Sequence, residues 1–188
     1  MSSWIQLDEH RVTWIFVVLG WSHDSEKQSP SNPQANQLTH WELGAGNSES
    51  LVRTVAERID REGIGSEKQL VHELLVELDQ YRHNGSTIIT PRPKDVRYLR
   101  QKILRLSRGD TTPTLRGFSQ VNLGDVLAEY FGQELSDYDI DPQTLPSPRV
   151  AEDGSETIVS AGAVREYWDC WARISNLVPA SHLAGDQL

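Results

Sequence analysis

Alternating apolar and polar residues near the start of the chain predict β-strands. The segments 3–10 (SWIQLDEH) and 11–21 (RVTWIFVVLGW) follow one another across a short turn, and together they predict a hairpin. The segment 38–44 (LTHWELG) alternates again and predicts a third strand. Residues 22–37 are polar and contain two prolines, so they predict a loop between the second and third strands.

Helical spacing of apolar residues takes over after residue 50. The first predicted helix covers 51–59 and follows Ser48 or Ser50 as its cap. Its apolar stripe consists of Leu51, Val52, Val55, Ala56 and Ile59. The second predicted helix covers 66–81 and opens with the capping-box spacing of Ser66 and Gln69. Its stripe consists of Leu70, Val71, Leu74, Leu75, Leu78 and Tyr81.

Strands and helices alternate in the second half of the chain. The segment 86–90 (STIIT) predicts a short buried strand, for which parallel pairing is plausible because helices flank it. A helix is predicted from Asp95, with Val96, Leu99, Ile103 and Leu106 on its buried side. Residues 118–132 predict a brief strand that turns directly into a helix, capped by Asn122 and closed by Gly132. A last helix is predicted over 160–178, followed by a frayed tail.

This order of elements predicts the fold class. Three antiparallel strands followed by strand–helix alternation describe an α/β protein with a mixed sheet flanked by helices. A length of 188 residues suits one domain covering 1–188. Residues 133–158 hold three prolines and seven acids, which predicts a long irregular acidic segment inside that domain.

Composition narrows the possible classes of protein. The chain is acidic, with 27 acids, 18 bases and a net charge of −9. The single cysteine, Cys170, excludes an internal disulfide and a cysteine-based zinc site. No apolar run is long enough for a membrane span, so no membrane partner and a cytoplasmic location are expected. The histidines show no tight metal-binding spacing, and the chain has neither a Gly-x-Ser-x-Gly motif nor a phosphate-binding P-loop.

The charge is unevenly distributed. Residues 92–116 carry eight bases and two acids, a net charge of +6, so the rest of the chain carries −15. Candidate nucleic-acid-binding residues in this basic island are Arg92, Lys94, Arg97, Arg100, Arg105 and Arg108. Two interpretations remain open, an electrostatic footprint for phosphate or the solvated face of one helix.

The middle of the chain resembles a known enzyme family. Residues 66–104 resemble the second exonuclease motif region of DnaQ-like (DEDD) 3′–5′ exonucleases, including the proofreading domain of family B DNA polymerases. In that family a Ser-Glu-Lys-x-Leu-Leu helix leads to a strand and then to Phe-Asp-Leu-x-Tyr-Leu. Here SEKQLV opens the helix and DVRYL follows the strand, so Asp95 matches the second-motif aspartate. The segment REYWDCWARI (165–174) resembles the last helix, with Asp169 at the position of the final aspartate.

The resemblance implies a ribonuclease H-like fold and a two-metal site. In the family, four carboxylates hold two Mg²⁺ or Mn²⁺ ions about 4 Å apart, which activate water against a phosphodiester. Asp95 and Asp169 are the implied metal ligands, with Asp8 as a third catalytic acid.

The family's first-strand motif, Asp-x-Glu, is absent from both candidate first strands of this chain. A first strand beginning at Trp4 would put Asp8 and His10 at those positions, whereas one beginning at Trp14 would put Gly20 and Ser22 there. Arg165 stands where the family places a Tyr or His that orients water.

Three functions therefore remain open. The chain is a degenerate exonuclease-like pseudoenzyme that binds DNA or RNA through its basic island, an active metal-dependent nuclease with a rearranged site, or a protein-interaction module that uses residues 133–158. Asp95 itself has two interpretations, a metal ligand or a helix cap.

Overall fold

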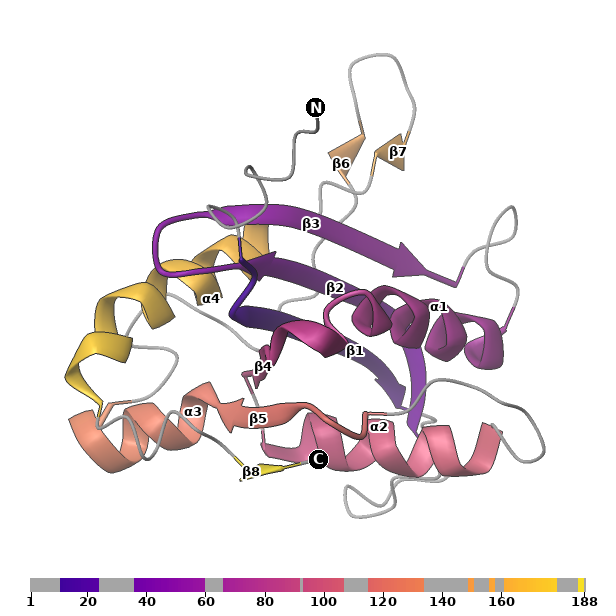
Figure 1. Cartoon of the computed structure of the whole chain (residues 1–188). Helices are drawn as coiled ribbons and strands as arrows, with labels where there is room; N and C mark the ends of the chain where they lie inside the picture. The colour runs from indigo at the N-terminus through magenta and orange to yellow at the C-terminus, as the bar shows by residue number, and fades with distance from the viewer. Residues whose placement is uncertain are drawn as a thin grey trace, which may run out of the picture.

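The computed structural model describes residues 11–23, 36–59, 66–91, 93–106, 115–133, 149–150, 156–157, 161–178 and 186–187. The strands in chain order are β1 (Trp14–His23), β2 (Asn36–Gly46), β3 (Leu51–Arg58), β4 (Thr87–Thr90), β5 (Ser119–Asn122), β6 (Arg149–Val150), β7 (Glu156–Thr157) and β8 (Asp186–Gln187). The α-helices are α1 (Glu67–Asp79), α2 (Pro93–Leu106), α3 (Leu123–Val126) and α4 (Ala161–Ile174). Shorter helical turns are η1 (Arg82–Asn84), the π-helical η2 (Leu127–Phe131) and η4 (Ser175–Leu177) (Figure 1).

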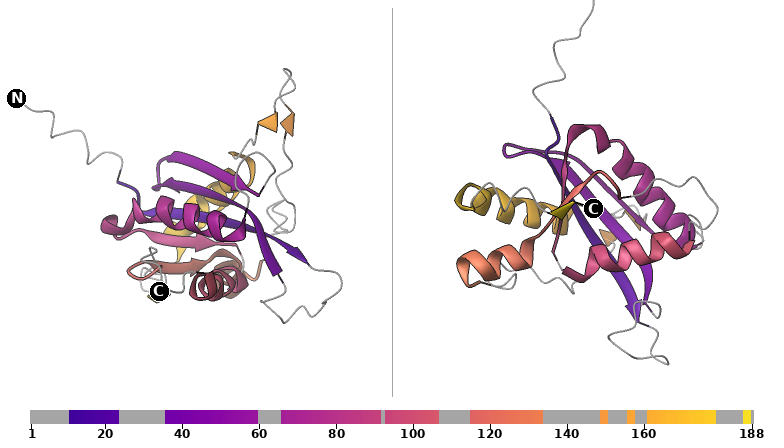
Figure 2. Two further views of the ribbon diagram at one scale, coloured as in Figure 1. Left: turned by 90° about the vertical axis from the view of Figure 1, so that its right-hand side faces the viewer. Right: turned by 60° about the horizontal axis from the view of Figure 1, so that its bottom comes forward.

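A single mixed sheet organises these elements. Its strand order is β3-β2-β1-β4-β5-β8, and β6 pairs only with β7. Strands β1, β2 and β3 are antiparallel neighbours, whereas β4 runs parallel to β1 and β5 runs parallel to β4. Figure 2 shows the far ends of β1 and β2 extending beyond the helices. The predicted α/β class with a mixed sheet is confirmed.

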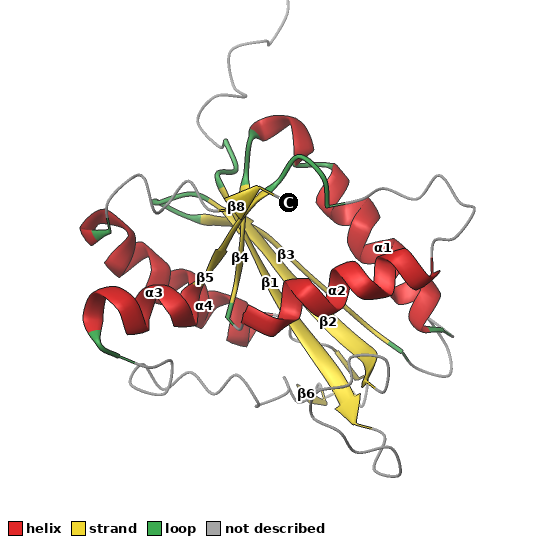
Figure 3. Ribbon diagram, turned by 90° about the horizontal axis from the view of Figure 1, so that it is seen from below, coloured by secondary structure: helices red, strands yellow, loops and turns green. Residues whose placement is uncertain are grey.

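Helices cover both faces of the sheet. Helices α1 and α2 lie on one face, and α3 and α4 lie on the other (Figure 3). The central strand β1 is buried on both sides because its residues alternate: Ile15, Val17 and Leu19 face α1 and α2, whereas Phe16 and Val18 face α4.

Local sequence signals placed several helix ends correctly. Ser66 caps α1, accepting a hydrogen bond from the Gln69 backbone N–H at 3.2 Å. Asn122 caps α3 in the same way, accepting from the Asp125 N–H at 2.8 Å. Gly132 ends the following π-helical turn with φ of 59°, a left-handed conformation that favours glycine. Helix α2 begins at Pro93, two residues before the predicted start.

The prediction of a helix over 51–59 is wrong, because this segment is the edge strand β3. The Asn47 side chain accepts hydrogen bonds from the backbone N–H groups of Glu49 (2.9 Å) and Ser50 (3.0 Å). This turn folds the chain back along β2, so Leu51 pairs with Gly46. The third antiparallel strand is therefore β3, while the predicted strand 3–10 lies outside the described residues.

Three smaller differences concern segment ends. The predicted loop 22–37 is shorter at both ends, because β1 runs to His23 and β2 begins at Asn36. The predicted irregular segment 133–158 contains the short strands β6 and β7. Asp186 and Gln187 pair with β5 rather than fraying, because they add a strand to its open edge. Within the described segments, no helix is both long and apolar enough to cross a membrane.

Candidate functional site

The pairing of β1 with β4 identifies which residues hold the first-strand positions of the exonuclease motif. The strand beside β4 is the one that begins at Trp14, so Gly20 and Ser22 occupy those positions. Asp8 lies outside the described residues. Neither position on β1 therefore carries a carboxylate.

The space above Gly20 is filled by a histidine. A Cβ atom at Gly20 would lie only 1.7 Å from Cε1 of His40, the residue that pairs with Gly20 from β2. The Thr39 hydroxyl donates to the Gly20 carbonyl at 3.1 Å and lies 3.2 Å from His40 Nδ1. Since Thr39 has one hydroxyl proton, Nδ1 must be the donor in the second contact. The imidazole thus fills the space above Gly20, the residue that the resemblance sets at the position of the family's first acid.

Burial favours the uncharged form of the His40 imidazole. It lowers the pKa of His40 from its usual value, which favours the neutral ring. With the proton on Nδ1, Nε2 is left as an acceptor, and this buried atom has no hydrogen-bond partner among the residues that the structure describes.

Asp95 lies where the resemblance implies, in the first turn of α2 directly after β4. Its side chain is 1% exposed, and its Oδ1 accepts a hydrogen bond from the Trp21 indole N–H at 3.2 Å. The Trp21 ring packs edge-on against Tyr98 with centroids 5.8 Å apart. Asp95 is the third residue of α2 and is therefore not its N-cap. A carboxylate in the first turn of a helix is still stabilised by the positive end of the helix dipole. It joins the start of α2 to the end of β1.

Asp169 lies toward the other end of β1. Its neighbour Trp168 donates an indole hydrogen bond to the Asn47 carbonyl at 2.9 Å, and Trp171 packs edge-on against Trp14, 6.0 Å between centroids. Trp14 opens β1, whereas Trp21 lies seven residues on, which at about 3.3 Å per residue is roughly 20 Å away. The structure therefore does not bring Asp169 to Asp95.

The described part of the chain offers no alternative metal cluster. No group of three or more His, Cys, Asp or Glu side chains within it has the arrangement to hold a metal ion. The described residues thus do not by themselves fit the two-metal site that the resemblance implies.

Sequence reasoning missed a buried carboxyl group on β2. Glu42 pairs with Val18, lies on the α4 face two residues from His40, and is 1% exposed. Among the described residues, neither of its oxygens makes a hydrogen bond of full geometry. Burial raises its pKa to about 7, an effect that the Val164 backbone partly offsets and the negative charge of Glu166 reinforces. The signal that could have revealed this carboxyl group was a charged residue, Glu42, within the otherwise apolar run 41–46 (WELGAG).

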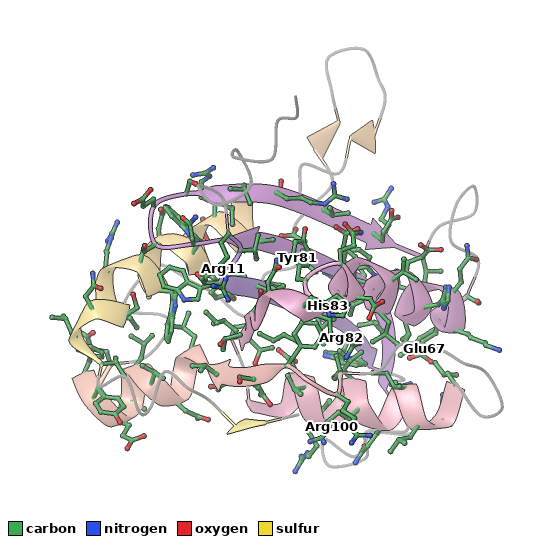
Figure 4. All side chains as sticks on the ribbon, viewed as in Figure 1. Arg11, Glu67, Tyr81, Arg82, His83 and Arg100 are labelled. Atoms are coloured by element: carbon green, nitrogen blue, oxygen red, sulfur yellow. The ribbon has the colours of Figure 1, made fainter. Side chains whose placement is uncertain are left out.

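The basic island divides into exposed and buried groups. Arg97, Arg100 and Arg105 on α2 are exposed, and Figure 4 shows Arg100 on the outer side of the helix. Lys102 is 3% exposed, with its Nζ 2.7 Å from Glu67 Oε1, so this base belongs to the core. Arg92 and Arg108 lie outside the described residues, as does the side chain of Lys94.

Comparison with known proteins gives matches in structure only. No protein-family model and no curated protein matches the chain. The nuclease domain of 3′hExo, a DEDDh family member bound to rAMP, matches with a TM-score of 0.54 and 10% identity, covering 90% of this chain and 94% of that one. A full-length 3′-exonuclease matches with a TM-score of 0.55 and 10% identity, covering 89% of this chain and 61% of that one. The chain therefore has the ribonuclease H-like fold of DEDDh-family 3′-exonuclease nuclease domains.

Proposed function

We propose that this chain is an exonuclease-like domain that has lost metal-dependent cleavage and binds nucleic acid through the outer face of α2. The observation that carries the loss of cleavage is the imidazole of His40 in the space above Gly20. A carboxylate cannot occupy that position unless the ring moves.

The chemistry of the remaining groups supports this loss. Mg²⁺ takes oxygen ligands and is held in such nucleases by carboxylates from several elements. Gly20 supplies no ligand, His40 is neutral, and Asp95 is hydrogen-bonded to the Trp21 indole. A pair of divalent ions would find little negative charge here to offset its own.

Three exposed arginines support the binding of nucleic acid. Arg97, Arg100 and Arg105 lie on one helix of a protein whose net charge is −9, so their face is a local exception to the overall charge. Phosphate contacts from such arginines carry no sequence preference. The rAMP bound to the 3′hExo nuclease domain supports a nucleotide-type ligand for this fold. DNA and RNA are both candidates.

Fluorescence anisotropy with single- and double-stranded DNA and RNA tests the binding. The wild type should bind with an affinity that falls steeply between about 50 and about 200 mM salt, because binding releases counterions from the phosphates. The double variant Arg97→Ala/Arg100→Ala should bind at least about tenfold more weakly, and its salt slope should drop by about 1.5.

The matched control removes the same charge from the opposite face of the sheet. Arg165→Ala/Arg173→Ala takes two exposed arginines from α4 and should leave the affinity close to that of the wild type. Equal losses in both double variants would indicate a general charge effect. Absence of salt-sensitive binding by the wild type would refute a role in nucleic-acid binding.

A further inference from the structure

The first turn of α4 lies unusually close to β2. A Cβ atom at Gly44 would lie 2.0 Å from Val164 Cγ1, so only glycine allows the helix this approach. Val164 itself is fully buried. The helix therefore closes tightly over the part of β2 that carries Glu42.

Glu42 lies within this contact with its carboxyl group almost fully buried, and the Val164 backbone offsets only part of the cost of that burial. A buried ionised carboxylate with no hydrogen bond is strongly unfavourable, whereas a neutral carboxyl group is far cheaper to bury. Among the described residues, no group makes a hydrogen bond of full geometry to either Glu42 oxygen, and only the Val164 backbone favours ionisation; the cross-strand neighbours are Val18 on β1 and Ala56 on β3.

Few charged groups among the described residues face Glu42. On β2, burial favours the neutral form of His40. On β3, Arg58 pairs with His40, two residue pairs along from Glu42 and Ala56 and therefore on the same sheet face. From α4, Glu166 adds a negative charge that opposes ionisation of Glu42. The strand β1 contributes only Val18 and Gly20 at this level.

We propose that the docking of α4 on the sheet is coupled to a proton on Glu42, so that ionisation of this carboxyl group releases the first turn of the helix. The later part of α4 is held independently, by the Trp168 hydrogen bond to Asn47 and the packing of Trp171 on Trp14. Release therefore begins at the N-terminal end of α4 and uncovers the sheet face that carries Gly20 and His40.

The direction of the pH effect follows from the two states of Glu42. In the docked helix its pKa is about 7, and in an opened, solvated state it returns to about 4.5. Docking of α4 is fully favoured below about pH 4.5, the pKa of Glu42 in the open state. It weakens as the pH rises toward about 7, the pKa of Glu42 in the docked state. The opening equilibrium should rise roughly tenfold per pH unit in this window, by about 300-fold in all, and level off above about pH 7.

Hydrogen–deuterium exchange of the α4 backbone tests the coupling. Exchange of the Val164–Ile174 amides, corrected for the intrinsic pH dependence of exchange, is measured from about pH 5 to about pH 8. In the wild type, α4 protection should fall across this range while α1 protection stays level. Glu42→Gln, a neutral isostere, should keep α4 protected throughout.

Two further variants sharpen the test. Glu49→Gln changes an exposed carboxylate in the β2–β3 turn and should behave like the wild type. Glu166→Gln leaves the buried site intact and should give a smaller rise in exchange that levels off at a lower pH, because one repelling charge is gone. Protection of α4 that does not vary with pH, or a parallel loss in α1, would overturn the proposal, as would unchanged pH dependence in Glu42→Gln.

Discussion

Gly20 and His40 are the pair of residues on which the proposed loss of metal-dependent cleavage depends, and their contact can be measured directly. Gly20→Ala should destabilise the fold by about 1–3 kcal/mol, because the new methyl group would overlap the imidazole. Chemical denaturation at neutral pH gives the free energy of unfolding.

A double-mutant cycle isolates this contact from other effects. In a His40→Ala background the ring is absent, so Gly20→Ala should then cost less than about 0.5 kcal/mol. Equal costs in the two backgrounds would mean that the ring does not occupy the space above Gly20.

Single residues also mark where sequence patterns suffice. Ser66, Asn122 and Gly132 were predicted correctly because a helix end depends on hydrogen bonds within a few residues. The start of a helix near Asp95, directly after β4, was also predictable from the local sequence, although the helix begins two residues earlier. Asp169 could not be placed, because its distance from Asp95 depends on how α4 lies across the sheet.

Whole elements likewise differ in whether local sequence or tertiary contacts decide their structure. Residues 51–58 have helical spacing of apolar residues, yet they form β3 because the Asn47 turn presents them to the open edge of β2. That pairing is tertiary and outweighs the local pattern. The signal that could have revealed it was the Gly-Asn-Ser sequence of 46–48 between two apolar runs.

The junction of α1 and α2 depends on one buried ion pair. Glu67 Oε1 lies 2.7 Å from Lys102 Nζ and accepts the Leu38 backbone N–H at 2.8 Å, so it joins two helices to β2. Lys102→Met should destabilise the protein by about 3 kcal/mol, because the partly buried Glu67 would lose its nearest cation. Thermal or urea unfolding measures the change.

Arg105 provides the control for this junction. Its guanidinium lies 3.5 Å from Glu67 Oε2 and its side chain is 48% exposed. Arg105→Met should therefore cost less than about 1 kcal/mol. A comparable loss in both variants would contradict a special role for the buried pair.

At the scale of the whole molecule, the fold was predictable although the two exonuclease structures that it matches are only 10% identical to it in sequence. The order of strands and helices sufficed, since a β1–β2–β3 meander followed by strand–helix alternation restricts the possible sheets. Activity does not follow in the same way, because it depends on a few side chains that the fold does not require.

The proposed loss of metal-dependent cleavage predicts how the intact protein responds to divalent ions. Millimolar Mg²⁺ or Mn²⁺ should leave its melting temperature unchanged, since a ligand stabilises a protein only by binding its folded state. Incubation with labelled oligonucleotides should give no cleavage above that of the Asp95→Ala variant. Metal-dependent stabilisation, or cleavage that Asp95→Ala abolishes, would restore the active-nuclease interpretation.

The two faces of the sheet are covered by parts of the chain that leave the ribosome at different times. The core beneath α1 and α2 uses residues between Val12 and Phe118, whereas the opposite core requires Val164–Val178. A nascent chain can therefore assemble the first core while Phe16 and Val18 still face the solvent. For the time needed to synthesise about 60 further residues, the half-folded domain presents an apolar sheet face, which is a natural substrate for chaperones.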